Sequence, residues 1–147
     1  MMASRTFLVV LLLTAPLAGC SNDPYESYCE SVSDHQRELT ELLAPRGPDA
    51  LLKALPVFRD LQDQAPPDIR DDWQIVVTGL SALDEAITAA GLDAANYDSE
   101  NPPADLSTED RERIEAAAAR LTRPDSVAAF GAVEQQARDV CKTPLYL

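Results

Sequence analysis

Residues 69–90 read IRDDWQIVVTGLSALDEAITAA and carry the most regular hydrophobic pattern in the chain. The apolar side chains recur at steps of three and four, at Ile69, Trp73, Val76, Val77, Leu80, Leu83, Ile87 and Ala90. This spacing predicts an amphipathic α-helix that buries one stripe of side chains and begins near residue 67 or 68. Acidic residues in its first turns suit the positive end of the helix dipole, and Gly91 is a typical residue to follow a helix end.

Two shorter stripes precede this helix. One predicts a helix from about residue 24 to residue 44, with Asp23 as its N-cap and the 45–48 turn, Pro-Arg-Gly-Pro, as its end. The other predicts a helix over about 49–64. Pro56 lies inside this second helix, so we expect a kink or a break near Leu55.

A long loop at 92–106 separates these helices from a last helical region. Ser107 is a typical N-cap, and the apolar pattern continues from there to about Lys142. Pro124 disfavours helical geometry at Arg123, which predicts an interruption at that point. We therefore expect an all-α fold, an up-down-up-down four-helix bundle whose fourth helix is broken.

The first twenty residues are typical of an export signal. Arg5 precedes an unbroken apolar run at 7–13, and small residues lead to Cys20. Seven helical residues rise about 10 Å, whereas a bilayer core is roughly 30 Å thick, so this run is too short to span a membrane. An ordinary signal, cut elsewhere with Cys20 incidental, is one interpretation.

The stretch Leu17-Ala18-Gly19-Cys20 favours a sharper interpretation, because it resembles the lipobox of bacterial lipoproteins. The resemblance implies that residues 1–19 are removed and that the Cys20 sulfur receives a diacylglyceryl group, with further acylation, such as palmitate, on its amine. Two acyl chains suffice for stable anchoring. We expect a signal peptide at 1–19, a lipidated cysteine and short tether at 20–23, a helical domain at 24–147, and a location on the outer face of the cell membrane.

The other two cysteines, Cys29 and Cys141, form an even pair in an exported chain, which favours a disulfide. In an up-down-up-down bundle the start of the first helix and the end of the last lie at the same end, which agrees with this pairing. Free thiols or metal ligation are the alternatives, although no Cys-x-x-Cys or histidine-rich spacing supports a metal.

The composition limits the partners. The chain has 12 Lys and Arg against 25 Asp and Glu, a formal net charge of -13. This balance argues against nucleic acid and against electrostatic adhesion to anionic lipid. Solubility explains the acidity, and a cationic partner is the alternative.

No catalytic motif is evident, so we expect a protein that is not an enzyme and has no cofactor or metal. His35 is the only histidine and lies beside an apolar stripe, which favours a structural role over a ligand or pH-sensing role. Asn96, Asp98 and Glu100 alternate like the opening of a calcium loop, but Asn101 and Ser107 stand where that loop needs Gly and Glu. Trp73 is expected in the core. It could instead line a pocket between helices with Tyr25, Tyr28 and Phe58.

Two stretches resemble small actinobacterial lipoproteins and secreted proteins of unknown function: APPDIRDDW at 65–73 and VEQQARDVC at 133–141. The resemblance implies a helical, disulfide-linked cell-envelope domain and no site residue. We expect a binding or interaction module anchored by Cys20, with an envelope protein or a small ligand as partner. The alternative is a structural or accessory subunit of an envelope complex. A hydrolase is disfavoured because no nucleophile–base pair is evident.

Overall fold

The structure is a computed structural model that describes residues 23–147, and within this range it is all-helical, as predicted. Cys20 and the predicted signal peptide lie outside the described residues. Five α-helices and one short 3-10 helix follow one another without a strand between Asp23 and Leu147. The elements are α1 (Pro24–Leu43), α2 (Pro48–Gln64), α3 (Arg70–Ala89), η1 (Ala94–Asn96), α4 (Thr108–Leu121) and α5 (Pro124–Asp139).

Local capping signals set several helix ends where the sequence predicts them. The Asp23 carboxylate accepts a hydrogen bond from the Tyr25 backbone N–H at 3.0 Å, and the Ser107 hydroxyl accepts one from the Asp110 N–H at 3.1 Å. Gly91 follows α3 with a φ of 78°, a conformation that costs glycine little. These bonds satisfy N–H groups that a helix start leaves without a partner.

Three boundaries differ from prediction. α2 does not break at Pro56, as one of the two expected outcomes had it, but runs as one helix with Pro56 exposed. α3 begins at Arg70 because the preceding residues form a turn, in which the Ile69 N–H donates to the Pro66 carbonyl at 3.2 Å. α5 ends at Asp139, three residues early, since Lys142 has a positive φ of 56° that a helix does not accommodate.

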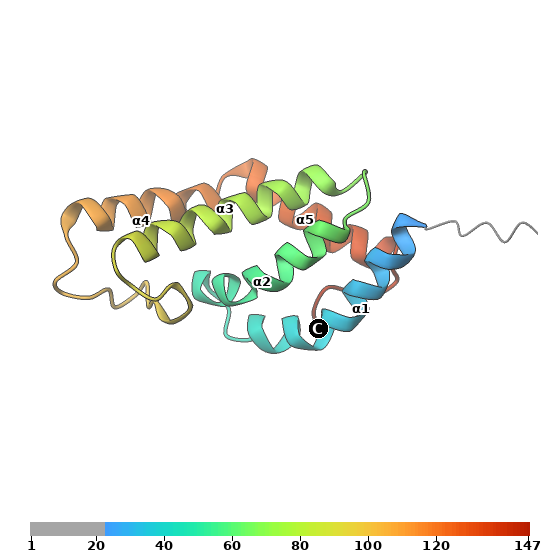
Figure 1. Ribbon diagram of the computed structural model, residues 1–147, viewed down its shortest axis with the longest axis horizontal. Helices are drawn as coiled ribbons and strands as arrows, with labels where there is room; N and C mark the ends of the chain where they lie inside the picture. Colours follow the sequence, from blue (N-terminus) through green and yellow to red (C-terminus); the bar gives the residue numbers. More distant parts are fainter. Residues whose placement is uncertain (1–22) are drawn as a thin grey trace, which may run out of the picture.

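The helices pack in sequence, α1 against α2, α2 against α3, and α3 against both α4 and α5 (Figure 1). α4 and α5 follow one another along the same side of α3. The turn between α2 and α3 lies at the end of the molecule where α1 begins, and the 92–106 loop lies at the other end. α3 is therefore the central element, in contact with α2, α4 and α5.

The core consists of two clusters of buried side chains. The larger one joins α1, α2, α5 and the first half of α3, and includes Tyr28, Trp73 and Val133. The smaller one joins the second half of α3 to α4, η1 and the start of α2, and includes Leu83 and Ile114. Leu121, the last residue of α4, packs against both clusters.

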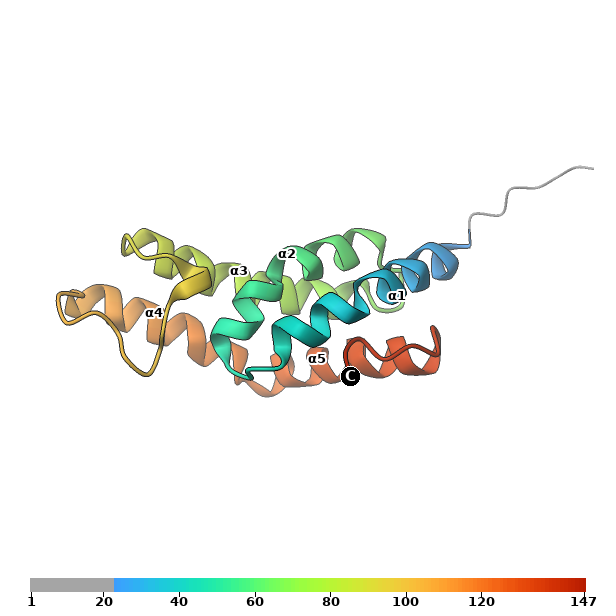
Figure 2. The same ribbon diagram turned by 90° about the horizontal axis from the view of Figure 1, so that it is seen from below.

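Residues 142–147, which we call the strap, run back along α1 after α5 ends (Figure 2). Two hydrogen bonds hold the strap to α1. The Gln36 side-chain amide donates to the Pro144 carbonyl at 2.8 Å, and the Leu147 N–H donates to the Thr40 hydroxyl at 3.0 Å. Leu145 is only 3% exposed and belongs to the larger cluster. The strap thus fills space between α1 and α5.

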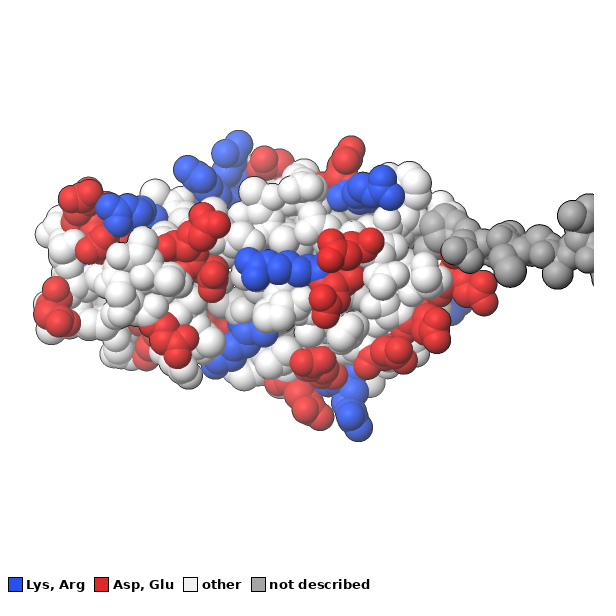
Figure 3. All heavy atoms as spheres, viewed as in Figure 1, with Lys and Arg blue, Asp and Glu red and all other residues white. Residues whose placement is uncertain are grey.

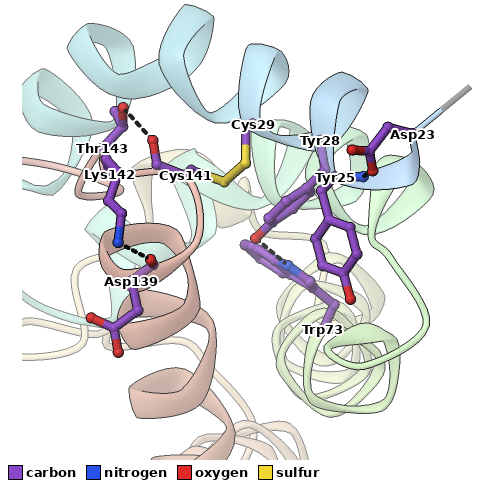
Figure 4. Close-up of a disulfide and its surroundings, with 9 residues drawn as sticks. All are labelled: Asp23, Tyr25, Tyr28, Cys29, Trp73, Asp139, Cys141, Lys142 and Thr143. Carbon is purple, nitrogen blue, oxygen red and sulfur yellow. Dashed lines mark hydrogen bonds between the residues drawn. A yellow bond between two sulfur atoms is a disulfide. The ribbon is translucent and has the colours of Figure 1, made fainter.

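A disulfide joins Cys29 and Cys141, as predicted, with 4.9 Å between the two Cα atoms. Figure 4 shows it between the second turn of α1 and the start of the strap. Beyond it the chain turns, with the Lys142 ammonium donating to the Asp139 carbonyl. The disulfide and the strap together link the first helix to the last.

Candidate ligand-binding cleft

A cleft of about 590 Å³ opens between α2 on one side and the α4–α5 region on the other. Arg46 and Gly47 before α2, and Leu145 and Tyr146 of the strap, also line it. Most of its lining is apolar, and the polar exceptions are few. Its lining residues are Leu43, Arg46, Gly47, Ala50, Leu51, Phe58, Trp73, Ala118, Leu121, Thr122, Phe130, Val133, Glu134, Leu145 and Tyr146.

Three aromatic rings from three helices form its deepest part. Phe58 of α2 lies 5.7 Å from Trp73 of α3 and 6.4 Å from Phe130 of α5, measured between ring centroids. The Phe58 and Trp73 rings are tilted by 47°, and the Phe58 and Phe130 rings, at 73°, have the edge-to-face arrangement that aromatic pairs favour. Because each ring comes from a different helix, their contacts define the width of the cleft at its floor.

Trp73 is held from behind by Tyr28, as Figure 4 shows. The indole N–H donates to the Tyr28 hydroxyl at 3.0 Å, and both side chains are fully buried. Burial raises the pKa of Tyr28 to about 12, although the hydrogen bond from Trp73 lowers it slightly. The indole therefore has its polar atom satisfied inside the core, which leaves an apolar ring edge toward the cleft.

The rim of the cleft carries its charged groups, Arg46 and Glu134. The Tyr146 hydroxyl donates a short hydrogen bond to the Glu134 carboxylate, and Arg138 lies 3.8 Å from the same carboxylate. The pKa of Tyr146 is raised to about 12, mainly because the hydroxyl is partly buried and also because it lies against the Glu134 carboxylate. Glu134 is thus engaged on two sides.

Arg46 is different, since its guanidinium forms no ion pair or side-chain hydrogen bond within residues 23–147. Its backbone has a φ of 54°, which is uncommon for a residue with a side chain. This conformation turns the chain between α1 and α2 and sets Arg46 at the rim. Arg46 and Tyr146 are near enough for the arginine charge to act on the tyrosine hydroxyl.

Of the four aromatic residues proposed for a pocket, two line the cleft and two do not. Trp73 and Phe58 form its floor, and Trp73 is also buried in the core, as expected. Tyr28 lies behind Trp73. Tyr25 lies at the start of α1, where the Asp68 carboxylate raises the pKa of its hydroxyl.

His35 does not belong to the cleft. Its side chain is 26% exposed on α1, and its Nδ1 lies 3.3 Å from the Glu38 carboxylate one turn away. The partly buried position agrees with the structural role expected from sequence.

The acidic side chain at the centre of the 92–106 loop makes hydrogen bonds within that loop. Asp98 accepts hydrogen bonds from the Glu100 N–H at 2.8 Å and from the Asn101 side chain at 2.9 Å, and these bonds lower its pKa. Within residues 23–147 no three His, Cys, Asp or Glu side chains are placed to hold a metal ion. A polar hollow of about 540 Å³ lies between this loop and the 45–49 turn.

Charged side chains elsewhere pair with their neighbours or face solvent. Arg113 contacts Asp110 at 2.6 Å and Glu109 at 2.9 Å on the outer face of α4. Asp110 also accepts from the Ser107 hydroxyl, and these contacts lower its pKa. Figure 3 shows acidic and basic side chains interspersed over one face, with wide uncharged areas between them.

Sequence reasoning missed the strap and the rim. Leu145 and Tyr146 wall the cleft although no helix pattern covers them. The Leu-Tyr-Leu run at 145–147 was a weak signal, because only Leu145 of the three is buried and Leu147 is 85% exposed. Arg46 had no signal beyond its place between two prolines.

Comparison with known proteins adds no relative: no family model matches the chain, and no curated protein or solved structure is significantly similar to it. The part of the chain described by the structure holds no helix both long and apolar enough to cross a bilayer.

Proposed function

We propose that this protein is a non-enzymatic binding module that holds a small apolar molecule in the cleft between α2 and α5. The observation that supports this most directly is the cleft itself, about 590 Å³ of mostly apolar surface around three aromatic rings. Ligand sites in proteins typically measure about 300–1,000 Å³ and combine an apolar lining with a few polar groups. Within residues 23–147 the exposed large apolar side chains are spread over α3, the α5 region and the strap; they are Ile75, Val127, Val140, Tyr146 and Leu147.

The polar groups around the cleft suit binding better than catalysis. They are Arg46, Thr122, Glu134 and Tyr146, and the last two are bonded to each other. A nucleophile needs a base within hydrogen-bond reach, and Thr122 instead donates to the Ala119 carbonyl of its own helix at 3.0 Å. These four polar groups would orient a ligand in the cleft.

Titration with 1-decanol, an uncharged straight-chain probe, tests the proposal. Trp73 is the only tryptophan in the sequence and lies in the cleft wall, so its fluorescence reports occupancy. We expect a saturable change and a matching heat of binding. Each methylene added to the alcohol should tighten binding about three- to fourfold while the chain still fits.

Two phenylalanine variants test whether the probe binds in the cleft, one that fills the cleft and one that serves as its matched control. Ala118→Phe places a ring in the cleft from α4, and we expect it to abolish decanol binding. Ala119→Phe adds the same ring one residue away on the exposed side, outside the cleft lining, and should bind decanol like the parent. No saturable binding, or equal binding by both variants, would contradict the proposal and leave the structural-subunit alternative.

The location we propose is the outer face of the cell membrane, with a lipid on Cys20. Support comes from the lipobox resemblance and from α1, which begins at Pro24 and leaves only Ser21, Asn22 and Asp23 as a tether. Three residues span at most about 10 Å, which would keep the disulfide end close to the bilayer. Cys20→Ser should shift the protein from the membrane fraction or leave it unprocessed; unchanged fractionation would show the assignment to be wrong.

We also propose that α4 and α5 act as one broken helix of an up-down-up-down bundle. Both pack against α3, and only Thr122 and Arg123 separate them. With the disulfide end at the membrane, the 92–106 loop and the 45–48 turn would point away from it.

A further inference from the structure

We propose that the ligand is an amphiphile with one apolar chain and a single anionic head group, and that Arg46 receives the head group at the rim. This inference rests on the proposed function, because it names the class of molecule that the same cleft would bind. It follows from three features of the rim and floor.

The first feature is the unpaired charge of Arg46. The guanidinium lines the cleft and has no acidic partner within the described part of the chain. Arg37, Arg111 and Arg120 also lack such a partner among the described residues, but of these four arginines only Arg46 lines the cleft. A guanidinium presents N–H groups in a planar fork that suits a carboxylate or a phosphate.

The second feature is the engagement of the other rim charge. Glu134 would repel an anionic head group if it were free, but it accepts from the Tyr146 hydroxyl and faces Arg138 at 3.8 Å. Its negative charge is therefore partly compensated by Tyr146 and Arg138. The rim thus presents one uncompensated cation and one compensated anion.

The third feature is the apolar floor, which offers nothing to a second polar group. Phe58, Phe130 and Trp73 meet there, and the Trp73 N–H is already bonded to Tyr28. A polar group placed at this depth would lose its water without gaining a partner. A ligand with one polar end and one apolar end therefore fits both the charged rim and the apolar floor of the cleft.

Three probes with the same ten-carbon chain test the head group, all used at pH 7 below the concentration at which they form micelles. They are decanoate, 1-decanol and decyltrimethylammonium. We expect decanoate to bind the parent at least about tenfold more tightly than decanol, the gain typical of a hydrogen-bonded charge pair. The cation should bind more weakly than decanol.

The net charge of the protein opposes the expected preference for decanoate over the uncharged and cationic probes. A net charge of -13 repels an anion and attracts a cation at long range, and salt screens both effects. A preference for decanoate must therefore come from a local group. We expect the preference to grow as salt rises from low ionic strength and the general repulsion is screened.

Arg46 variants assign that local group. Arg46→Asn keeps a residue that tolerates positive φ but removes the charge, and should weaken decanoate binding about tenfold, much more than it weakens decanol binding. Arg46→Lys should retain part of the preference. Arg37→Gln removes an exposed charge from α1, outside the cleft lining, and should bind all three probes like the parent.

The outcomes separate this inference from the proposed function. If decanol and decanoate bind equally, or if Arg46→Asn and Arg37→Gln behave alike, the head-group assignment is wrong while the apolar cleft stands. If no probe binds the parent, the proposed function fails as well. A preference for the cation that persists at high salt, where the net charge is screened, would also show that the head-group assignment is wrong.

Discussion

At the scale of single residues, the hydrogen bond between Trp73 and Tyr28 does most to define the site. Both side chains are fully buried, so neither polar atom can turn to water if the other is removed. The bond orients the indole that forms part of the cleft floor. A structural contact in the core thereby controls the shape of a surface feature.

Tyr28→Phe should lower the free energy of unfolding by about 1–3 kcal/mol at pH 7, because it leaves the indole N–H buried without an acceptor. Urea denaturation at pH 7 measures this loss. The pH dependence is a second readout. The folded-state pKa of about 12 lies above the ordinary value of 10, so the contribution of Tyr28 is complete below pH 10 and is lost between pH 10 and pH 12.

Over that interval the parent should lose about 2–3 kcal/mol that the variant does not lose, at 1.36 kcal/mol for each unit of pKa difference. The stability difference between parent and variant should therefore shrink at alkaline pH. An unchanged difference from pH 7 to pH 12 would show that the Tyr28 hydroxyl is not buried as described.

At the scale of elements, two helical glycines show how local and tertiary demands differ. Gly131 on α5 has open space where a Cβ would project. A Cβ on Gly79 of α3 would come within 2.9 Å of the Leu121 side chain. Leu121 is also a cleft residue, so the close approach of α3 to α4 is linked to the shape of the site.

Gly131→Ala should raise the free energy of unfolding by about 0.5–1 kcal/mol, the gain in helix propensity. Gly79→Ala offers the same gain in propensity, but it must displace Leu121, so its net gain should be smaller and its affinity for decanol should change. Thermal unfolding together with decanol titration checks both variants. Equal stabilisation with equal decanol affinity would contradict the predicted contact.

The same elements show what sequence alone can predict. Asp23, Ser107 and Gly91 act within a few residues of themselves, so the helix ends that they set were predictable. The apolar stripe on α3 is also a local pattern, and it correctly predicted that Trp73 lies in the core. The continuity of α2 through Pro56 was not predictable, because it depends on which side of the helix faces the core.

At the scale of the whole molecule, the cleft depends on contacts between residues far apart in the chain. Leu145 reaches the larger core cluster, and Gln36 bonds Pro144 across 108 positions of sequence. No local pattern encodes such pairings, which is why the strap and the rim escaped prediction. The disulfide was an exception, because the expectation of export already favoured pairing Cys29 with Cys141.

Removing the disulfide by Cys29→Ser with Cys141→Ser should lower the free energy of unfolding by about 4–5 kcal/mol, the chain-entropy value for a loop of this length. The two positions are 112 residues apart. Urea denaturation of the double variant against the oxidised parent measures the loss. A loss below about 1 kcal/mol would show that the strap and the helix contacts alone hold α1 to the last helix.

The disulfide also makes most of the chain a covalent ring. Exposed loop residues such as Asp98, Ser99 and Glu100 are natural points for a protease to cut, because loop tips are where nicking concentrates. A single cut there would leave both pieces joined through Cys29 and Cys141. After mild proteolysis the chain should keep its full mass on a non-reducing gel and separate into two fragments only after reduction, so a nicked molecule would keep α1 and the strap attached.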